Sequence, residues 1–480
     1  MKHVLVRNGR IVQANEDYIG SIIIEDSKIS QIVRNEAQVQ GEFDEVIDAS
    51  KMIVIPGLIN SHIHSYGNIV RGLIPAYSLE AWMLYVTALG RLMSEEDCYW
   101  NALLGAIDMI KSGTTCYVDH LAQPLGGLDA AMQACKQIGI RCIMAPMIAD
   151  TNYFTSLALD PGLVPEEYYQ EQTQSAQSLI ERTETLLKKW HDPNGKLQVG
   201  FGPSGPQRCS DKLLRTCSEK AKEYNAIVHT HVLETKWQAE SARRIYGEDM
   251  VKHLHKIGVL NENFSFAHGV AITDDEIKLA ADAGSWLVHN PSANFVLGSG
   301  TAPVDRYLQF GANVALGTDG ANGSGTLNMF ETIKQAAMIH NITDLTQNRM
   351  DKWITPSKAL HMATEMGAKA CGLNAITGRI EEGYSADLVL IDPMRSPRMA
   401  VPNDVYWQLA YTNPEECVDT VLICGEVVMK NRQLTCINEE EVLKEAAKRA
   451  QSLQERFSGA ELNKVLAQRK TVDDYFSTVK

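Results

Sequence analysis

The stretch "PGLINSHIHSYGNIVRG", residues 56–72, joins an apolar run to a pair of histidines. His62 and His64 follow the apolar residues 52–59 and are two positions apart. Side chains at positions i and i+2 of a strand point to the same face of a sheet. We therefore expect the two imidazoles to face one site at the end of a buried strand, as a pair of metal ligands would.

Short apolar runs of this kind alternate with longer helical patterns through the middle of the chain. Strand-like runs lie near residues 58–62, 115–118, 141–147, 197–202, 226–231, 264–268, 285–289 and 313–318. Helical patterns between them include residues 127–138, 171–190, 211–224, 236–257, 274–283 and 326–340. Eight such strands predict an α/β fold, a (β/α)8 TIM barrel with catalytic residues at the C-terminal ends of the strands.

The two ends of the chain contain short strands and turns instead. Residues 1–56 and 386–436 are predicted to form one small β-sandwich domain, and Asn8-Gly9 is typical of a hairpin turn. The barrel is predicted to occupy residues 57–385. The charged, helical tail, residues 437–480, is expected to be a surface helix or an oligomer contact.

Composition excludes several classes of protein. The 480 residues carry a formal net charge of −14, so the clustered basic residues that bind nucleic acid are not expected. The N-terminus does not resemble a signal peptide, and no apolar run approaches the roughly 20 residues of a membrane span. Ten scattered cysteines without a Cys-x-x-Cys motif predict reduced thiols in a cytoplasmic protein.

Ionisable residues gather where five of the predicted strands end. They are His62 and His64, then His229, His231 and Glu234, then His268, His289 and Asp319. Three imidazoles and a carboxylate suit Zn²⁺ or Fe²⁺, and an open metal site lowers the pKa of a bound water to about 7. Asp319 could both bind the metal and take the proton of that water. Glu234 could shuttle protons, and His268 could orient the hydroxide.

These residues stand within a longer series of motifs that resembles the amidohydrolase superfamily, in its aminohydrolase and chlorohydrolase branch. The series comprises "PGLINSHIH", "VRG", "GFGPSGP", "HTHVLET", "AHG", "HNPSANFVLGSGTAPV", "GTDGANGSGTLNMFE" and "GRIEEGYSADLVLID". The branch includes methylthioadenosine/S-adenosylhomocysteine deaminases, guanine deaminases and triazine hydrolases. The resemblance covers nearly the whole chain.

The resemblance implies one metal ion per chain, Zn or else Fe. Its ligands would be His62, His64, His231 and Asp319, and Glu234 would be the proton-shuttling glutamate. His268 would contact the hydroxide instead of the metal. Two-metal relatives carry a carboxylated lysine at the end of strand 4, where this chain has "VGFGPSGP" and no lysine.

Five further residues are predicted to bind substrate, each beside a plainer alternative. Trp82 is where the family often places an aromatic ring over a flat substrate, and His289 resembles a residue near the substrate. Arg71 could meet an anionic group or form a structural ion pair. His120, next to Asp119, ends the second predicted strand, and Asn294 could order a loop. His229 could touch substrate or be a hydrogen-bonded barrel histidine.

Three positions separate the chain from adenosine-type deaminases of the branch. Those enzymes hold the ribose with a glutamate after the tryptophan, but residues 83–90 contain no carboxylate. They carry a histidine after "GFGP", where this chain has Ser204, and an arginine after strand 3, where it has Pro146. The resemblance therefore implies the same reaction, attack of metal-bound hydroxide on a ring carbon with loss of ammonia, on a different and smaller N-heterocycle.

Other functions remain open at this point. The metal site would also serve hydrolytic release of chloride or an alkylamine from a triazine-like ring, or opening of a cyclic amide. A non-catalytic binding protein, or a metal-storage role, would not need Glu234 and His268. A small heterocyclic substrate is the expected partner, together with further copies of the chain in a homo-oligomer.

Overall fold

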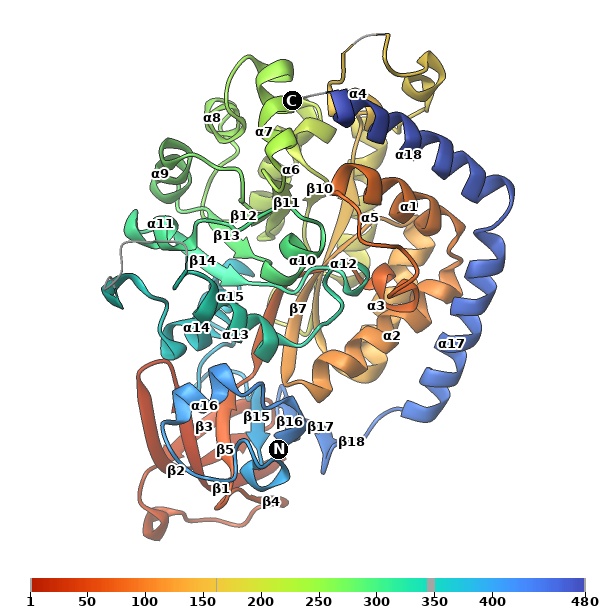
Figure 1. Ribbon diagram of the computed structural model, residues 1–480. Coiled ribbons are helices and arrows are strands. Elements are labelled where there is room, and N and C mark those ends of the chain that lie inside the picture. The colour runs from red at the N-terminus through yellow and green to blue at the C-terminus, as the bar shows by residue number, and fades with distance from the viewer. Residues whose placement is uncertain (1, 161, 343–349, 479–480) are drawn as a thin grey trace.

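The computed structural model describes residues 2–160, 162–342 and 350–478. Parallel strands surrounded by helices form its larger part, and a separate sheet lies below them in Figure 1. The chain is thus an α/β protein, as predicted. Those parts of the predicted divisions that fall on residues 1, 161, 343–349 and 479–480 lie outside the described residues.

The parallel strands follow the predicted series closely. They are β6 (Leu58–Ile63), β7 (Thr114–Leu121), β8 (Arg141–Ile148), β9 (Leu197–Val199), β10 (Gly202–Pro203), β11 (Val228–Val232), β12 (Phe264–His268), β13 (Trp286–His289) and β14 (Asn313–Leu316). They form two parallel sheets, with β6, β7 and β8 followed by β9 and β10 in one and β11 to β14 in order in the other. Their side chains are almost all buried, because helices cover the outside of a parallel sheet.

Hydrogen bonds also connect the two parallel sheets at both of their edges. A parallel bridge pairs Phe201, between β9 and β10, with Val228 of β11. At the other edge the amide of Asp319 donates to the carbonyl of His62, over 2.9 Å. Beside it, Asn60 donates to Thr318 Oγ1 over 2.8 Å and accepts from the Thr318 amide. The end of β14 is therefore held against the end of β6.

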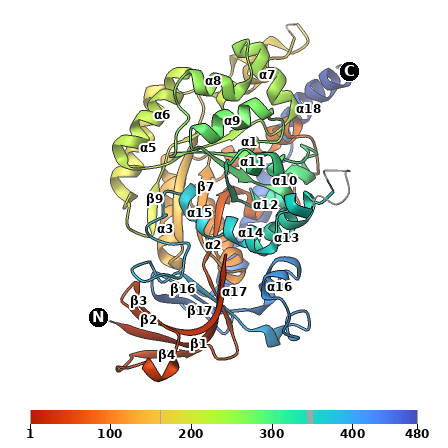
Figure 2. The ribbon, with the colours of Figure 1, turned by 90° about the vertical axis from the view of Figure 1, so that its left-hand side faces the viewer.

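Amphipathic helices connect the strands and enclose them (Figure 2). Those up to the middle of the chain are α1 (Leu79–Leu92), α2 (Glu95–Lys111), α3 (Leu125–Ile138), α4 (Tyr153–Leu157), α5 (Ala176–Trp190), α6 (Asp211–Tyr224), α7 (Lys236–Tyr246) and α8 (Met250–Lys256). Those after it are α9 (Asp274–Asp282), α10 (Pro291–Val296), α11 (Val304–Gln309), α12 (Ala321–Ser324), α13 (Met329–Ile339), α14 (Pro356–Met362) and α15 (Glu365–Ala370).

The two ends of the chain meet in one nine-stranded sheet. Its strands are β1 (His3–Gln13), β2 (Glu16–Glu25), β3 (Lys28–Val33), β4 (Glu45–Asp48), β5 (Ile53–Pro56), β15 (Leu388–Ile391), β16 (Val418–Ile423), β17 (Glu426–Lys430) and β18 (Gln433–Leu434), with α16 (Val405–Tyr411) nearby. The N-terminal and C-terminal parts pair through β5 and β15, which run antiparallel. Red and blue strands accordingly lie side by side in Figure 1.

A buried ion pair links this sheet to the parallel strands. Arg141, the first residue of β8, donates to the Asp387 carboxylate over 3.0 Å, and both side chains are fully buried. Arg141 also donates to Ser385 and to the Gly195 carbonyl. A buried charge is tolerated only where it is paired and hydrogen-bonded, so these contacts hold the two parts of the protein together.

Two local expectations need correction. Asn8-Gly9 is a bulge inside β1, with the φ angle of Asn8 at 57°, and the turn to β2 comes later. The helix expected over residues 236–257 is two helices, because Gly247 adopts a φ of 71° and ends α7. The sequence pattern did not show this break, since the apolar period continues into α8.

The tail forms two helices that lie against the rest of the chain. They are α17 (Glu439–Arg456) and α18 (Ala460–Thr478), and Figure 1 shows them along α2 and α1. Arg449 and Arg456 both donate to the buried carboxylate of Asp97, at 3.2 and 2.8 Å. The tail is therefore packed on its own chain, whichever partner its outer face meets.

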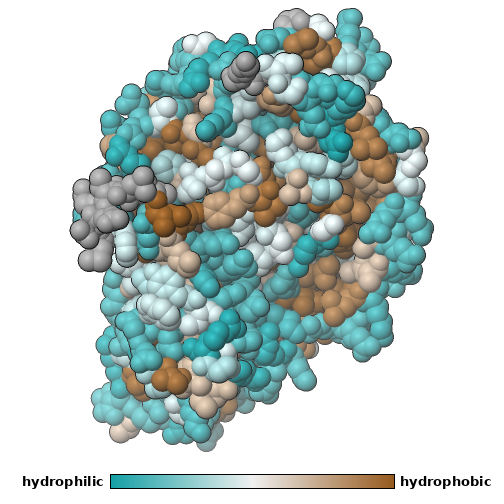
Figure 3. All heavy atoms as spheres, in the orientation of Figure 1, coloured by the Kyte–Doolittle hydropathy of each residue, from teal (hydrophilic) through white to brown (hydrophobic). Residues whose placement is uncertain are grey.

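The surface drawn in Figure 3 is mainly hydrophilic, with hydrophobic patches near α10 and beside the tail helices. Phe295 and Val296 of α10 are among the exposed large hydrophobic residues, at 44% and 45%. Within the described ranges, no helix combines the length and the apolar character that a membrane span requires.

Candidate metal centre and active site

Three imidazole nitrogens and a carboxylate converge at the C-terminal ends of the parallel strands. Nε2 of His64 lies 3.1 Å from Nε2 of His231 and 3.3 Å from Oδ1 of Asp319. Nε2 of His62 lies 3.4 Å from the same oxygen. The four predicted ligands thus come from β6, the residue after it, β11 and the loop after β14.

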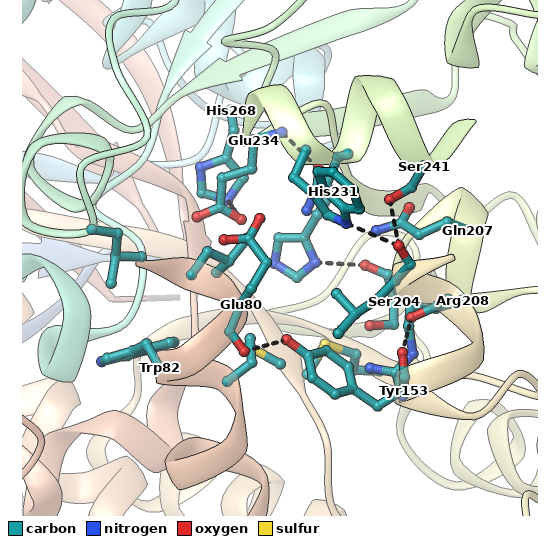
Figure 4. Close-up of a pocket in the computed structure, with 18 of the residues that line it drawn as sticks. Glu80, Trp82, Tyr153, Ser204, Gln207, Arg208, His231, Glu234, Ser241 and His268 are labelled. Carbon is teal, nitrogen blue, oxygen red and sulfur yellow. Dashed lines mark hydrogen bonds and ion pairs between the residues drawn. The ribbon is translucent and has the colours of Figure 1, made fainter. Parts of the chain in front are cut away.

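Each of the three histidines has its other ring nitrogen engaged. Nδ1 of His64 lies 2.5 Å from the His120 carbonyl, and Nδ1 of His231 lies 2.6 Å from the Ser204 carbonyl. Carbonyls only accept, so both Nδ1 atoms donate and both Nε2 atoms keep a lone pair for a metal ion. Figure 4 shows the bond from His231 to Ser204.

His62 is oriented by a chain of two further side chains. Its Nδ1 lies 2.7 Å from Nε2 of His229, whose Nδ1 lies 2.8 Å from Ser265 Oγ. If each Nδ1 donates along this chain, Nε2 of His62 has a free lone pair facing the other ligands. That atom is buried and has no hydrogen-bond partner in the described part of the chain. His229 therefore has the position of a hydrogen-bonded barrel histidine.

The donor set fits a divalent metal ion. Around a tetrahedral ion with bonds of about 2.0–2.1 Å, neighbouring ligand atoms are about 3.3 Å apart. The three distances above, 3.1, 3.3 and 3.4 Å, agree with that spacing. Burial lowers the pKa of His62 and His231 well below the ordinary range, and neighbouring histidines add to the effect. Neutral imidazoles are the form that binds a metal ion.

Two further groups face this centre from the other side. Nε2 of His268 lies 3.5 Å from Oε2 of Glu234 and 3.9 Å from Oδ2 of Asp319. Its Nδ1 lies 2.9 Å from the side-chain oxygen of Asn294, which fixes the plane of the ring. Burial raises the pKa of Glu234 well above its ordinary value, with smaller contributions from Asp319 and Glu80. The Glu234 carboxyl group is therefore suited to hold a proton.

Backbone strain is concentrated at the same place. Leu233, His268 and Asp319 have φ angles of 52°, 78° and 66°, a region that residues other than glycine seldom adopt. Each lies just at or after the end of a parallel strand. Such strain persists where the surroundings over-determine it, and it is typical of functional sites. Here it turns His268 and Asp319 toward the metal ligands.

A pocket opens beside the centre (Figure 4). Its walls include His64, His231, His268, Glu234 and Asp319 at the metal end. Trp82, Leu79, Met83, Met147, Leu157 and Leu297 supply apolar surface, and Tyr66, Glu80, Tyr153, Ser156, Ser204, Gln207, Arg208, Trp237, Gln238 and Ser241 supply polar groups. An apolar pocket with a few convergent polar groups is the usual form of a small-molecule site.

The structure separates the five predicted substrate contacts. Trp82 lines the pocket, and His120 and Asn294 lie behind it as partners of His64 and His268. Arg71 donates to Asp108 over 2.8 Å and is not among the residues that line this pocket. His289 is fully buried and lies 5.5 Å, ring to ring, from His340, also away from the pocket wall.

Sequence reasoning missed several residues of the pocket. Glu80, two residues before Trp82, is buried, accepts from Thr235 over 2.6 Å and has a pKa raised by burial. A carboxylate in the apolar face of a helix is a signal that could have revealed it. Tyr153 of α4 donates to the Glu80 carbonyl over 2.8 Å. Arg208 follows the "GFGPSGP" motif and could have been noticed there.

Comparison with known proteins agrees with this geometry. The model of the amidohydrolase family matches residues 53–428. The chain belongs to the amidohydrolase family. It is therefore a metal-dependent hydrolase acting on carbon–nitrogen bonds, which confirms the predicted class of enzyme and the predicted recognition.

Among curated relatives of this amidohydrolase, a 5-methylthioadenosine/S-adenosylhomocysteine deaminase of Thermoanaerobacter pseudethanolicus is 34% identical over 95% of this chain and 100% of its own. Among solved structures, a zinc-bound adenosine deaminase of Xanthomonas campestris matches with a TM-score of 0.84 at 23% identity, covering 94% and 99% of the chains. A zinc complex of an atrazine chlorohydrolase of Arthrobacter aurescens matches with the same TM-score at 22% identity, covering 93% and 100%. Both structures share the fold of this chain.

Proposed function

We propose that the chain is an aminohydrolase that releases ammonia from a ring carbon of a small N-heterocycle. One observation carries the proposal: the Glu234 carboxyl group lies in the pocket wall beside Asp319 and His268, buried and with its pKa raised. The ring nitrogen must gain a proton as the neighbouring carbon is attacked, and the amino group must gain one in order to leave as ammonia. Glu234, whose pKa is raised by burial, is suited to supply the first proton. Asp319, after it has accepted a proton from the attacking water, would supply the second.

His62, His64, His231 and Asp319 would hold the metal ion, for which we propose Zn with Fe as the alternative. When bound there, such an ion lowers the pKa of a water molecule to about 7. Measurement of the metal content by mass spectrometry would test the proposal, with one zinc ion per chain expected. If the purified protein contained iron and were active only with iron, iron would be assigned to the site in place of zinc.

The residues of the chain divide the proton transfers between them. Asp319 Oδ2 faces His268 and is placed to accept a proton from the attacking water. Glu234 would give its proton to the ring nitrogen. His268, held by Asn294 through Nδ1, would use its Nε2 side to orient the attacking oxygen. Trp82 would cover the flat face of the ring and exclude water from it.

The substrate is proposed to differ from that of the adenosine-type relatives. The name of the Thermoanaerobacter relative, a 5-methylthioadenosine/S-adenosylhomocysteine deaminase, supports deamination as the type of reaction. However, Met83 and Ser204 line this pocket where that branch is expected to present ribose-binding groups, and Pro146 lies near the end of the neighbouring strand, β8. We propose a heterocycle without a ribose at that position.

Ammonia release tests the reaction directly. The zinc-loaded protein would be assayed against guanine, 8-oxoguanine, cytosine, isocytosine, adenosine, methylthioadenosine, pterins, melamine and aminotriazines, with Glu234→Gln as the control for contaminating activity. Ammonia from at least one compound, absent in the control, is expected. The proposal would be wrong if no compound released ammonia and the protein instead released chloride or an alkylamine from a triazine, or opened a cyclic amide.

We propose further that β6 to β14 close into a single (β/α)8 barrel over residues 57–385. The Phe201–Val228 bridge and the hydrogen bonds from Asp319 and Thr318 to the end of β6 support closure at both edges. Residues 1–56 and 386–436 would form one β-sandwich domain, and residues 437–480 a helical tail. Limited proteolysis should then leave residues 57–385 as one resistant unit.

Two broader expectations accompany this function. All ten cysteines are free, which supports the proposal of a reducing, cytoplasmic location. The exposed Phe295 and Val296 support a homo-oligomer, because large apolar side chains at a surface are often covered by a partner. Light scattering coupled to gel filtration would give the number of copies, and a monomer would contradict the second expectation.

A further inference from the structure

A second cavity adjoins the catalytic pocket and shares a wall with it. The residues that border both are Tyr66, Met83, Met147, Tyr153, Ser204 and Arg208. The catalytic pocket has a volume of about 70 Å³, and the adjoining cavity of about 440 Å³. A substrate larger than its reacting ring would therefore extend from the first cavity into the second.

Acidic residues line the catalytic pocket, whereas arginines line the adjoining cavity. The acidic groups that line the catalytic pocket are Glu80, Glu234 and Asp319, and Arg208 at its border is its only arginine or lysine among the described residues. The adjoining cavity is lined by Arg91, Arg182 and Arg208 but by a single carboxylate, Glu171. In a chain with a net charge of −14, such an excess of arginine inside a cavity points to an anionic ligand.

Arg208 is the most informative of these residues. Its Nε is buried without a hydrogen-bond partner, and the described residues form no ion pair or side-chain hydrogen bond with its guanidinium group. Its nearest defined neighbour is the ring of Tyr153, with the guanidinium carbon 5.2 Å from the ring centre. Figure 4 shows the two side by side, across the pocket from Trp82.

Arg182 of α5 also lacks an ion-pair partner among the described residues. Its Nε is also buried without a partner, and burial lowers the pKa of Arg182 as it does that of Arg208. By contrast, the buried Arg141 has Asp387 as its partner, and Arg91 is paired with Glu171. Both side chains are half-buried, and each has a buried Nε to which no described residue is hydrogen-bonded. A ligand in the cavity would satisfy donors that the described residues leave unpaired.

We propose that Arg208 and Arg182 bind a carboxylate or phosphate group of the substrate, whose amine-bearing ring lies between Trp82 and Glu234. This inference rests on the proposed function and narrows its substrate class to amino-heterocycles that carry an anionic substituent. Guanidinium groups suit both anions, because their planar N–H donors match pairs of carboxylate or phosphate oxygens.

The test compares compounds that differ only in the anionic group. Pterin is paired with pterin-6-carboxylate, cytosine with 5-carboxycytosine, and adenosine with adenosine 5′-phosphate. Affinity for the zinc-loaded, full-length protein is measured by calorimetry, which does not depend on turnover. In at least one pair the anionic member is expected to bind ten-fold or more tightly. Preference for the carboxylates or for the phosphate would identify the anion, and either supports the proposal.

Variants of the two arginines test whether these residues cause the preference for the anionic compound. Arg208→Gln and Arg182→Gln are each expected to reduce the ratio of the affinities for the anionic and the uncharged member at least five-fold. Arg208→Lys keeps the charge and should retain part of the advantage. Arg215→Gln is the matched control, because Arg215 is exposed on α6 and lies outside both cavities. Thermal unfolding of each variant verifies that it is folded.

Equal affinity for both members of every pair would overturn the proposal. So would a preference that persists unchanged in both glutamine variants. Ammonia is measured in the same samples, which separates the two hypotheses. An anion preference that depends on Arg208, without ammonia from any compound, would refute the aminohydrolase assignment and leave the anion site in place.

Discussion

Nδ1 of His62 lies 2.7 Å from Nε2 of His229, so a metal ligand on β6 is oriented by a histidine on β11. His229 is itself held by Ser265 of β12. Three strands thus determine the direction in which one imidazole presents its lone pair. Removal of a group that orients a metal ligand commonly lowers the affinity for the metal.

His229→Ala should therefore weaken metal binding by about 10–100-fold without removing a ligand. His62→Ala should abolish stoichiometric binding under the same conditions. Competition with a zinc chelator would measure both affinities. His229 would have no orienting role if the alanine variant bound zinc as tightly as the wild type.

Glu234→Gln should keep its metal and lose activity by about 10²–10⁴-fold, because the proton shuttle is removed while the ligands stay. Metal content and turnover would be measured on the same preparation. His268→Gln offers a comparison, since it leaves Glu234 intact but removes the imidazole beside it. Normal turnover by the Glu234 variant would contradict its assignment.

The buried pair of Arg141 and Asp387 should be important for stability. Burial by itself would raise the pKa of Asp387, but Arg141 and the Cys424 amide hold the pKa below its usual value. Asp387→Asn leaves a buried charge without its partner, and a loss of about 3–5 kcal/mol in the free energy of unfolding is expected. Urea unfolding would measure it. The double variant Arg141→Met, Asp387→Leu should lose less than Asp387→Asn, and a larger loss would argue against this account.

His340 should make stability depend on pH. Burial lowers the pKa of His340 to about 4, partly offset by Asp305, against about 6.5 in an unfolded chain. Between these values the unfolded state binds more protons than the folded state. The contribution of neutral, buried His340 to the free energy of unfolding is therefore complete above pH 6.5 and is lost as the pH falls toward 4.

At pH 5 this loss should reach about 2 kcal/mol relative to pH 7. His340→Gln removes the titrating group, so unfolding by urea should show a correspondingly smaller difference between pH 7 and pH 5. His3, which is half-buried near the N-terminus, is a suitable control when replaced by Gln. Equal pH slopes in wild type and the His340 variant would refute the prediction.

The end of α18 supports a wall of the catalytic pocket. The ring of Trp237, which lines the pocket, lies 5.6 Å from Tyr475 and 4.9 Å from Phe476. Tyr475 also donates to Asp160 over 3.0 Å and accepts from Arg244. Tyr475→Ala should raise KM for the eventual substrate several-fold, because Trp237 loses its support.

Leu466→Ala is the control for this experiment, since Leu466 lies on the same helix and is 37% exposed. Steady-state kinetics and thermal unfolding would be measured for both variants. If the tyrosine variant changed only stability, with KM and kcat unaffected, the tail would have no part in shaping the pocket.

The motif residues were readable in the sequence because each is tied to a strand end. An apolar run that ends at His62, His231 or Asp319 predicts a buried strand and also places a polar side chain at the end of that strand. The same reasoning could not foresee Gly247, since a break in a helix depends on how α7 and α8 pack, and the apolar period runs through both. The prediction of a hairpin turn at Asn8-Gly9 was wrong because residues that readily adopt a positive φ occur in β-bulges as well as in turns.

By itself, the sequence predicted the order of strands and helices and the polar residues at the strand ends, because these depend on residue type and on period. The choice of metal ligands among those residues came from the resemblance to the family. Only the tertiary structure decided what lies between them. It brought Glu80 and Tyr153 into the pocket and paired Arg141 with Asp387. It also placed Arg208 and Arg182 in a cavity where no described residue forms an ion pair with either. These contacts are between residues far apart in the chain, and no local sequence pattern shows whether a charged side chain forms an ion pair in the folded protein.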